Sequence, residues 1–426
     1  MTLVVRNGRA DSLTLAGRVV SPTQAVDEVL EITVEDGVIT RLEPARADGN
    51  VLVLAPAFVD PHVHLRTPGR EDEETIRSGT EAAAAGGYCA ILAMPNTDPV
   101  VDTATVLEAL VERARAEAVI PTGFMAAISK GQRGDELTEM AELAAQGAAA
   151  FTDDGRPVVS AGLMRRALQY SGLTGRRLAV HCEDLALSRG GHAHEGLVSA
   201  ELGLGGYPSV AESVMVERDL ALAAFEERPL HVMHVSAEES VAALHAAQAA
   251  GVPATGEVTP HHLCLTDEAV RSLDANVKMN PPLRAEDDRR ALISALRDGT
   301  IGAVATDHAP HAPHEKEVPF EEAPFGVTGL ETAFSALYTH LVLPGVLGLE
   351  TVLERMSAGP ARALGLDEPR IEVGARANLV ALDLDAEWRV TEDGFRSRSQ
   401  NSWLLGHTLR GRVVRTVADG REVYAA

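Results

Sequence analysis

The sequence predicts an α/β protein built on a (β/α)8 TIM barrel, joined to a small β-sandwich domain formed by the N- and C-terminal segments. Three observations indicate this fold class. Short apolar strand patterns alternate with amphipathic helix patterns along the middle of the chain, as in barrels of about 250 residues or more. Both ends carry only short strand patterns, which need partners to be stable. The chain has 426 residues, 45% of them hydrophobic, enough for a large core and an accessory domain.

The two ends are predicted to pair with each other. Asp36-Gly37 and Asp419-Gly420 each lie between two short strand patterns and are typical of a hairpin turn. Leu3-Val4-Val5 leads into a further turn signal at Asn7-Gly8. The predicted domains are residues 1–55 with 370–426 for the small β domain, and residues 56–369 for the barrel.

The middle of the chain supplies the barrel. Its predicted strands end at His64, at Asn96, near Ala126, and at Asp154, Glu183, His234, Pro260 and His308. Its predicted helices cover residues 71–85, 104–117, 136–146, 161–170, 209–226, 238–249, 289–298 and 329–341. A doubly wound open sheet is the competing architecture. That fold usually places a Gly-rich phosphate-binding turn after its first strand, and here the turn is a His-x-His segment.

Composition narrows the class of protein. The formal net charge of −24 disfavours nucleic acid and anionic membranes as partners. The cysteines Cys89, Cys182 and Cys264 are odd in number and far apart, so they predict no disulfide framework. No apolar run reaches membrane-spanning length, and the N-terminus lacks a secretory signal pattern. We therefore expect a cytoplasmic protein.

His62 and His64 follow the apolar run 51–59. Side chains at positions i and i+2 of a strand point to the same face, so these imidazoles offer two nitrogen ligands to one metal ion. Alone, such a pair is equally consistent with ordinary histidines. The recurrence of similar side chains at later strand ends favours the metal site.

Those later strand ends carry further imidazoles and carboxylates, which a barrel would gather at one face. Four imidazoles and two carboxylates exceed the needs of one tetrahedral ion and suit two divalent ions that share a bridging carboxylate. Zinc suits mixed nitrogen and oxygen ligands best, although ligand type leaves cobalt and manganese open. The candidate ligands are His62, His64, Asp153 or Asp154, His181, His234 and Asp307.

Nine motifs together carry a resemblance to a known family. They lie at residues 60–66, 94–97, 151–155, 181–183, 234–236, 260–262, 278–282, 305–311 and 323–326. With these motifs the chain resembles the amidohydrolase superfamily and, within it, the bacterial dihydroorotases whose two zinc ions are bridged by an aspartate. Many relatives use a carbamylated lysine as the bridge. The fourth strand end reads Phe-Thr-Asp-Asp without a lysine, which argues against hydantoinase and dihydropyrimidinase.

The resemblance implies roles for individual residues. It makes His62, His64 and Asp307 ligands of the first zinc, His181 and His234 ligands of the second, and Asp154 the bridge, with Asp153 as second choice. It makes Asp307 the general acid/base that works with a metal-bound hydroxide. It assigns the substrate to His64, Arg66, Asn96, Asn280, His311, Phe325 and Gly326. Arg66, Asn96 and His311 would bind the substrate carboxylate, and Asn280 with Phe325-Gly326 would contact the ring. Arg66 lies two residues past His64, on the same side of a segment that is predicted to be extended.

The implied reaction is the reversible closure of N-carbamoyl-L-aspartate to L-dihydroorotate and water in pyrimidine biosynthesis. Two alternatives stay open: an allantoinase or another cyclic-amide hydrolase, and a non-catalytic scaffold for a transcarbamoylase. The resemblance also leaves open an aspartate transcarbamoylase partner and a homo-oligomer.

Overall fold

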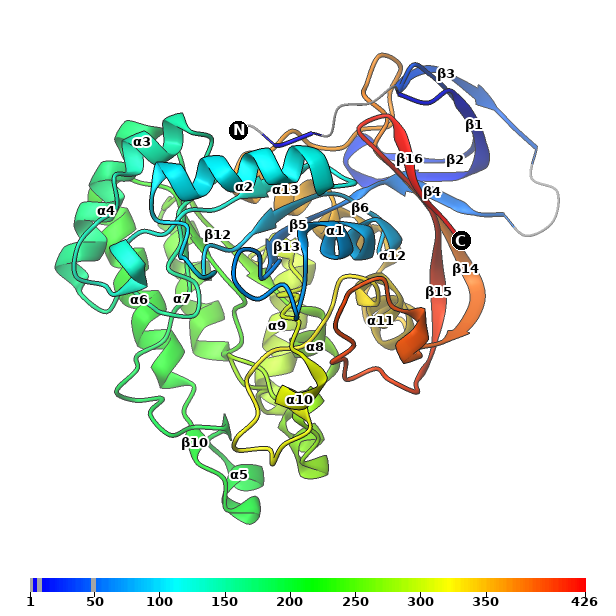
Figure 1. Cartoon of the computed structure of the whole chain (residues 1–426). Coiled ribbons are helices and arrows are strands. Elements are labelled where there is room, and N and C mark those ends of the chain that lie inside the picture. The colour runs from blue at the N-terminus through cyan, green and yellow to red at the C-terminus, as the bar shows by residue number, and fades with distance from the viewer. Residues whose placement is uncertain (1–2, 6–9, 47–50) are drawn as a thin grey trace.

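The computed structural model describes residues 3–5, 10–46 and 51–426 and has an α/β fold (Figure 1). The predicted turn at Asn7-Gly8 lies outside the described residues. The strands are β1 (Leu13–Ser21), β2 (Val26–Glu35), β3 (Val38–Pro44), β4 (Val53–Pro56), β5 (Phe58–Val63), β6 (Tyr88–Ala93), β7 (Thr122–Phe124), β8 (Leu178–Val180), β9 (Ala193–His194), β10 (Gly206–Tyr207), β11 (Leu230–Val232), β12 (Ala254–Val258), β13 (Ala303–Val304), β14 (Leu379–Arg389), β15 (Thr408–Ala418) and β16 (Arg421–Ala425).

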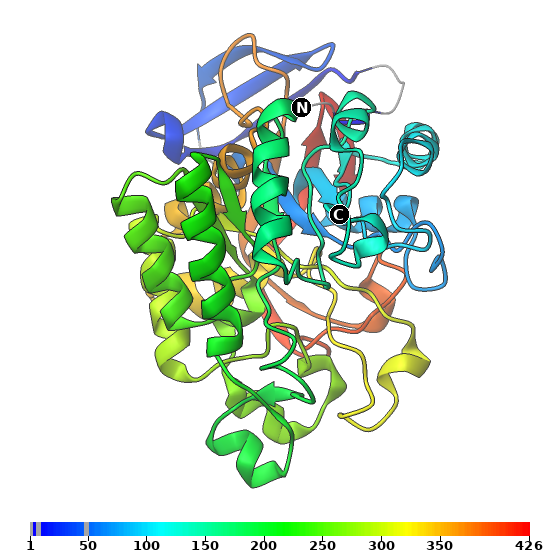
Figure 2. The same ribbon diagram turned by 90° about the vertical axis from the view of Figure 1, so that its left-hand side faces the viewer.

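The helices are α1 (Ile76–Ala85), α2 (Ala104–Glu117), α3 (Met140–Ala145), α4 (Ala161–Thr174), α5 (Leu197–Leu202), α6 (Val210–Glu226), α7 (Glu238–Ala249), α8 (Pro260–Cys264), α9 (Glu286–Asp298), α10 (Pro313–Lys316), α11 (Ala333–Leu337), α12 (Leu349–Met356) and α13 (Ala358–Leu364). Helices α4, α6, α7 and α9 lie side by side on the outside of the parallel strands (Figure 2). In the described part of the chain, no helix is long and apolar enough to cross a membrane.

The two ends of the chain share one seven-stranded sheet in the order β16-β15-β14-β4-β1-β2-β3. The antiparallel pair β14–β4 joins the C-terminal strands to the N-terminal ones, which confirms the predicted pairing of the ends. Both predicted hairpins are present; in the first, Asp36 and Gly37 have φ of 49° and 77°. Leu3–Val5 was expected to join this sheet, but Val4 instead bridges to Thr122 of β7 through two backbone hydrogen bonds.

The strands of the middle segment pair in parallel. One group has the order β5-β6-β7, and a second has the order β13-β12-β11-β8. Phe151 bridges to Ala126 beyond β7 and to Leu178 of β8, and Val63 of β5 bridges to His308 beyond β13. The strand pairing therefore runs through both groups and returns to β5. Where a fourth strand was predicted, the pairing is made by isolated bridges of Phe151.

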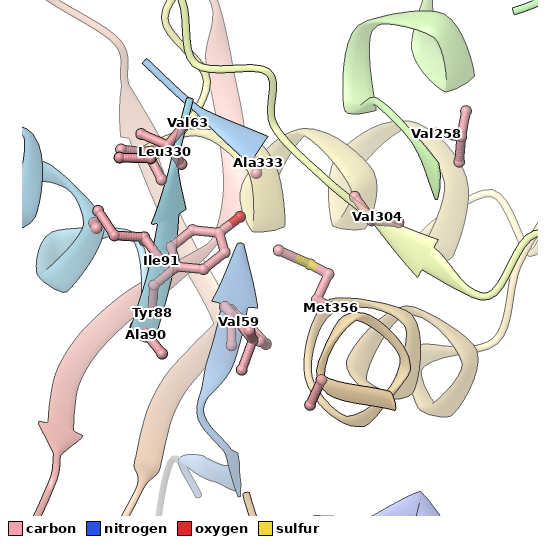
Figure 3. Packing of buried hydrophobic residues seen from close by; sticks show 14 of the residues in the cluster. Val59, Val63, Tyr88, Ala90, Ile91, Val258, Val304, Leu330, Ala333 and Met356 are labelled. Atoms are coloured by element: carbon pink, nitrogen blue, oxygen red, sulfur yellow. The ribbon is translucent and has the colours of Figure 1, made fainter. Parts of the chain in front are cut away.

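The core lies between these strands and their helices, and every residue of β5 and β6 is buried. Tyr88 and Ile91 of β6 and Val63 of β5 lie beside Leu330 and Ala333 from the segment before and within α11 (Figure 3). Such close packing leaves little freedom to the strand ends, where the candidate ligands lie.

Most predicted helices occur close to their predicted bounds, and those at residues 104–117 and 238–249 match α2 and α7. The helix predicted from residue 71 instead begins at Ile76. Thr75 caps it by accepting a hydrogen bond from the Ser78 N–H. The preceding residues turn inward, so Glu73 and Glu74 are buried rather than lying on a helix surface.

Candidate active site

Five of the six candidate metal ligands lie near the carboxyl end of a parallel strand. His62 is the next-to-last residue of β5, His64 lies just beyond that strand, and His181, His234 and Asp307 follow β8, β11 and β13. Asp154 follows Phe151, which makes isolated parallel bridges to Ala126 and Leu178. His234 and Asp307 have φ of 32° and 48°, in the left-handed region that costs an L-residue about 1–2 kcal/mol. The surrounding structure holds these two residues in an unfavourable backbone conformation, as is common at functional sites.

Asp154 lies at the centre of this group. Its carboxylate oxygens are 3.5 Å from His62 Nε2 and 3.4 Å from His64 Nε2. They are also 3.7 Å from His181 Nδ1 and 3.8 Å from His234 Nε2. One carboxylate therefore faces all four imidazoles, the position expected of a bridging ligand.

Asp307 closes the other side of the group. Its Oδ1 lies 3.1 Å from His64 Nε2 and 3.3 Å from His62 Nε2. Burial would raise the pKa of Asp307, but the neighbouring imidazoles, His62 first, hold it below its ordinary value. Asp154 is likewise kept ionised, because the positive potential of His62 and its neighbours outweighs the effect of burial on its pKa. Both acids are available as anionic ligands.

The donor set fits a divalent cation. His62 Nε2 is buried without a hydrogen-bond partner although two carboxylates lie near it. His181 Nδ1 and His234 Nε2 are only 2.8 Å apart. Two groups of three, His62-His64-Asp307 and His62-Asp154-His234, have ligand atoms close enough to surround one ion each. Imidazole nitrogens and carboxylate oxygens are ligands typical of zinc.

The adjacent acid, Asp153, faces away from this centre. Its carboxylate accepts hydrogen bonds from the N–H groups of Ile128 (2.8 Å) and Ser129 (3.0 Å) and from the Ser129 hydroxyl. Burial raises the pKa of Asp153 to about 6. Of the two acids that the sequence left open, the structure brings Asp154 to the cluster and uses Asp153 to anchor the loop after β7.

Two buried carboxylates that the sequence analysis missed orient the candidate ligands. Glu257 of β12 lies 2.8 Å from His62 Nδ1 and 2.8 Å from His231 Nε2. Glu183 lies 3.0 Å from His181 Nε2 and accepts a hydrogen bond from Asn280 Nδ2 at 3.1 Å. Such contacts fix which ring nitrogen faces the metal. The signal for Glu257 was an acid within a short strand pattern, β12, directly before the apolar Val258.

A pocket opens over this cluster. It contains every residue assigned to the substrate from the resemblance, namely His64, Arg66, Asn96, Asn280, His311, Phe325 and Gly326. The pocket also includes Asp154, His181, His234 and Asp307. A small ligand in it would touch the candidate metal ligands and the predicted substrate residues together.

Arg66 reaches the pocket by a different path from the one predicted. The sequence suggested an extended segment, but Arg66 has φ of 54°. Its Nε donates to the Pro310 carbonyl at 3.1 Å and lies 3.1 Å from Glu73. Asn96 lies closer to the candidate metal ligands, with its Oδ1 2.9 Å from His64 Nδ1 and its Nδ2 3.3 Å from Asp154.

The other side of the pocket is formed by loops. His311 Nε2 donates to the Phe325 carbonyl at 2.8 Å, so two predicted substrate residues contact each other directly. The buried Asn401 accepts a hydrogen bond from the His311 N–H at 3.0 Å and donates to the carbonyls of Ala309 and Gly326 at 3.1 and 3.2 Å. No sequence pattern indicated Asn401, because it lies in a segment assigned to the small β domain.

Known proteins resemble this chain in sequence and in fold. Residues 49–240 match the family model described as "Dihydro-orotase-like". A protein named dihydroorotase from Geobacter metallireducens is 44% identical over 416 residues, 96% of this chain and 98% of that protein. Another from Anaeromyxobacter dehalogenans, strain 2CP-C, is 47% identical over 419 residues, 96% of each chain.

Solved structures give the same picture of the fold. L-hydantoinase (dihydropyrimidinase) from Arthrobacter aurescens is 26% identical with a TM-score of 0.85, over 96% of this chain and 94% of that one. A dihydropyrimidinase from Brevibacillus agri is 22% identical with a TM-score of 0.81, over 97% of this chain and 95% of that one. Fold and site together define a cyclic amidohydrolase. Within that class, the extent and identity of the sequence matches show that the chain belongs to the dihydroorotase family.

Proposed function

We propose that the pocket catalyses the reversible closure of N-carbamoyl-L-aspartate to L-dihydroorotate and water, the dihydroorotase reaction of pyrimidine biosynthesis. The observation that carries this proposal is the position of Asp154, which faces four imidazoles at the base of a pocket that also contains Arg66. A carboxylate among four imidazoles suits metal-assisted hydrolysis of an amide. The guanidinium of Arg66 suits a substrate that carries a carboxylate.

The proposed metal ligands are His62, His64, Asp154, His181, His234 and Asp307, which would hold two zinc ions. Bound divalent ions would polarise the amide carbonyl and provide a nucleophile from water at neutral pH. The protein contributes the geometry. Glu257 and Glu183 hold the far nitrogens of His62 and His181, so that the near nitrogens stay directed at the shared centre.

Asp307 is the proposed general acid/base. Asp307 lines the pocket, and its lowered pKa keeps it a carboxylate. In hydrolysis this carboxylate can accept a proton from the attacking water. The proton then passes to the leaving ring nitrogen, which completes amide cleavage. In the direction of ring closure the same carboxyl group takes the proton from the attacking nitrogen.

The substrate carboxylate would bind to Arg66, Asn96 and His311. A guanidinium presents a planar pair of N–H groups that matches a carboxylate. Asn280 and the backbone of Phe325-Gly326 would contact the ring. The His311 Nε2–H is committed to the Phe325 carbonyl, so we expect this hydrogen bond to lengthen or exchange when substrate binds.

A second candidate is hydrolysis of another cyclic amide, such as allantoin or hydantoin, because the hydantoinase structures share the fold. The fourth strand end places Asp154, not a lysine, at the centre of the cluster, and this favours the dihydroorotase reaction. A non-catalytic scaffold for a transcarbamoylase is the third candidate, which the completeness of the donor set disfavours.

The proposed architecture is a (β/α)8 barrel at residues 56–369 and a β-sandwich at residues 1–55 with 370–426. The ring of parallel pairings and the terminal seven-stranded sheet support it. A cytoplasmic location is proposed because Cys89, Cys182 and Cys264 are free thiols. An aspartate transcarbamoylase partner and a homo-oligomer remain part of the proposal.

The test combines metal analysis with competing substrates. The purified chain is expected to hold about two zinc ions and to prefer dihydroorotate over hydantoin and allantoin in kcat/KM. Removal of the metal by a chelator is expected to abolish turnover, and zinc is expected to restore it. A preference for allantoin or hydantoin would reject the dihydroorotase proposal, and metal-loaded protein without turnover on any of the three would favour the scaffold.

A further inference from the structure

Glu73 is a buried acid next to the pocket, with 1% of its surface exposed. Its carboxylate lies 3.1 Å from Arg66 Nε, 3.3 Å from His311 Nδ1 and 2.8 Å from Arg70 Nη2. Arg66 and His311 line the pocket, whereas Glu73 stands behind them. One side chain thus holds two residues of the proposed carboxylate subsite that are 245 positions apart in the chain (311 − 66).

Both contacts of Arg66 described above use Nε, one to Glu73 and one to the Pro310 carbonyl. They fix one edge of the guanidinium of Arg66, which lines the pocket. Arg66 also has φ of 54°, a conformation that its backbone does not favour by itself. The orientation of this side chain therefore depends on its partners, and Glu73 is the charged one.

His311 is fixed from two sides. A carbonyl oxygen only accepts, so the contact to the Phe325 carbonyl places a proton on Nε2. The Nδ1 of the neutral ring then accepts a hydrogen bond from the Glu73 carboxyl group at 3.3 Å, and burial raises the pKa of that carboxyl to about 7. Glu73 is itself anchored, because its backbone carbonyl accepts a hydrogen bond from the Ser399 hydroxyl at 2.7 Å. The ring of His311 is thereby held in one plane at the edge of the pocket.

Glu73, His311 and Glu315 are close enough together to surround a metal ion. Arg70 Nη2 already lies 2.8 Å from Glu73 and 2.6 Å from Glu315, and Arg66 pairs with Glu73 as well. Guanidinium groups therefore supply the positive charge that a cation would bring. These ion pairs favour a structural role for Glu73 over a third metal site.

We propose that Glu73 is a positioning residue for substrate specificity: it orients Arg66 and His311 so that the subsite accepts the carboxylate of dihydroorotate. The inference rests on the proposed function, since it needs a substrate with that carboxylate. Glu73 does not take part in the metal cluster. Its contribution should appear in the recognition of the substrate carboxylate and not in the chemical step.

The test compares two substrates in the full-length enzyme: L-dihydroorotate and its methyl ester, which lacks the negative charge. Glu73→Gln is expected to raise KM for dihydroorotate about tenfold with kcat changed less than about threefold, and Glu73→Ala to raise KM further. Kinetics on the ester should change by less than about twofold, because the ester does not need an oriented guanidinium. Glu73→Asp should restore part of the loss, and zinc content should stay constant.

Asp72→Asn is the matched control, since it removes the same charge one position away on an exposed side chain. An unchanged or lower KM for dihydroorotate in Glu73→Gln would overturn the proposal, and so would an equal loss on the ester. If the metal content of Glu73→Gln fell by one ion per chain, Glu73 would instead be a ligand of a third metal site. A wild-type enzyme that does not turn over dihydroorotate would instead reject the proposed function, and this inference with it.

Discussion

The candidate metal ligands and the proposed carboxylate subsite lie at one pocket but are held in different ways. His62, His181 and His234 come directly from the ends of parallel strands, whose spacing is fixed by backbone pairing. Arg66 and His311 come from loops and are fixed by side chains from elsewhere in the chain. A regular sheet can position the first group alone, whereas the second needs a set of specific polar contacts.

Arg66, His311, Phe325 and Gly326 form what we call the loop side of the pocket, and part of it is held by buried lysine side chains. Buried Lys278 donates to the carbonyls of Phe320 (2.7 Å) and Ala323 (2.7 Å), and Lys316 donates to the carbonyl of Pro324 (2.8 Å). These contacts hold the segment that leads to Phe325 and Gly326. The candidate metal ligands at the strand ends form the strand side of the pocket. Mutations there should change metal content or the chemical step, whereas mutations on the loop side should change substrate affinity.

The largest expected effect is that of Asp307→Asn, on the strand side. An amide cannot accept and return the proton, so kcat should fall about 1000-fold or more while the protein stays folded and keeps part of its zinc. Steady-state kinetics with metal analysis would measure both quantities. Activity within tenfold of wild type would remove Asp307 from the proton-transfer step.

Arg66→Ala tests the loop side directly. The variant leaves a substrate carboxylate without its paired guanidinium, so KM for dihydroorotate should rise about 100-fold with a much smaller change in kcat. Zinc content should equal that of wild type. If kcat fell instead and KM stayed constant, the division between the two sides of the pocket would be wrong.

Glu257→Gln tests whether the strand side depends on buried partners as well. The amide weakens the hydrogen bond to His62 Nδ1, and zinc affinity should fall about tenfold or more. Competition with a metal chelator would measure this affinity, with exposed Glu112→Gln as the control. Unchanged affinity would mean that strand geometry alone orients His62.

Asn401→Ala should give the smallest effect of this series. It removes hydrogen bonds to the backbone of His311, Ala309 and Gly326, so KM should rise about tenfold or less, with zinc content unchanged. Gln400→Ala, at the neighbouring position, is the control. A loss of zinc in Asn401→Ala would show that the two sides of the pocket are mechanically coupled.

The metal side could be largely predicted from the sequence. Strand periodicity and the recurrence of His and Asp at strand ends pointed to the six residues that cluster in the structure. Periodicity could not choose between Asp153 and Asp154, because neighbouring residues on a short irregular segment differ only in the direction they face. The backbone contacts of Asp153 settle which carboxylate joins the cluster.

The loop side was predicted less well. Glu73 was placed on a helix because its local pattern is charged and helix-like, and only contacts to Arg66 and His311 show its actual position. Arg66 was expected on an extended segment, but its backbone turns at a positive φ. Asn401 carries no local signal at all. Contacts between residues 75 to 244 positions apart leave no periodic trace in a single sequence.

The contacts of residues 397–401 with the pocket loops have a consequence for biosynthesis. Ser399 binds the carbonyl of Glu73, and Asn401 binds the loops at His311 and Gly326. These two residues leave the ribosome after every other part of the pocket has been made. A nascent chain can thus bring the candidate metal ligands together before it has made the side chains that hold the loops on the other side of the pocket.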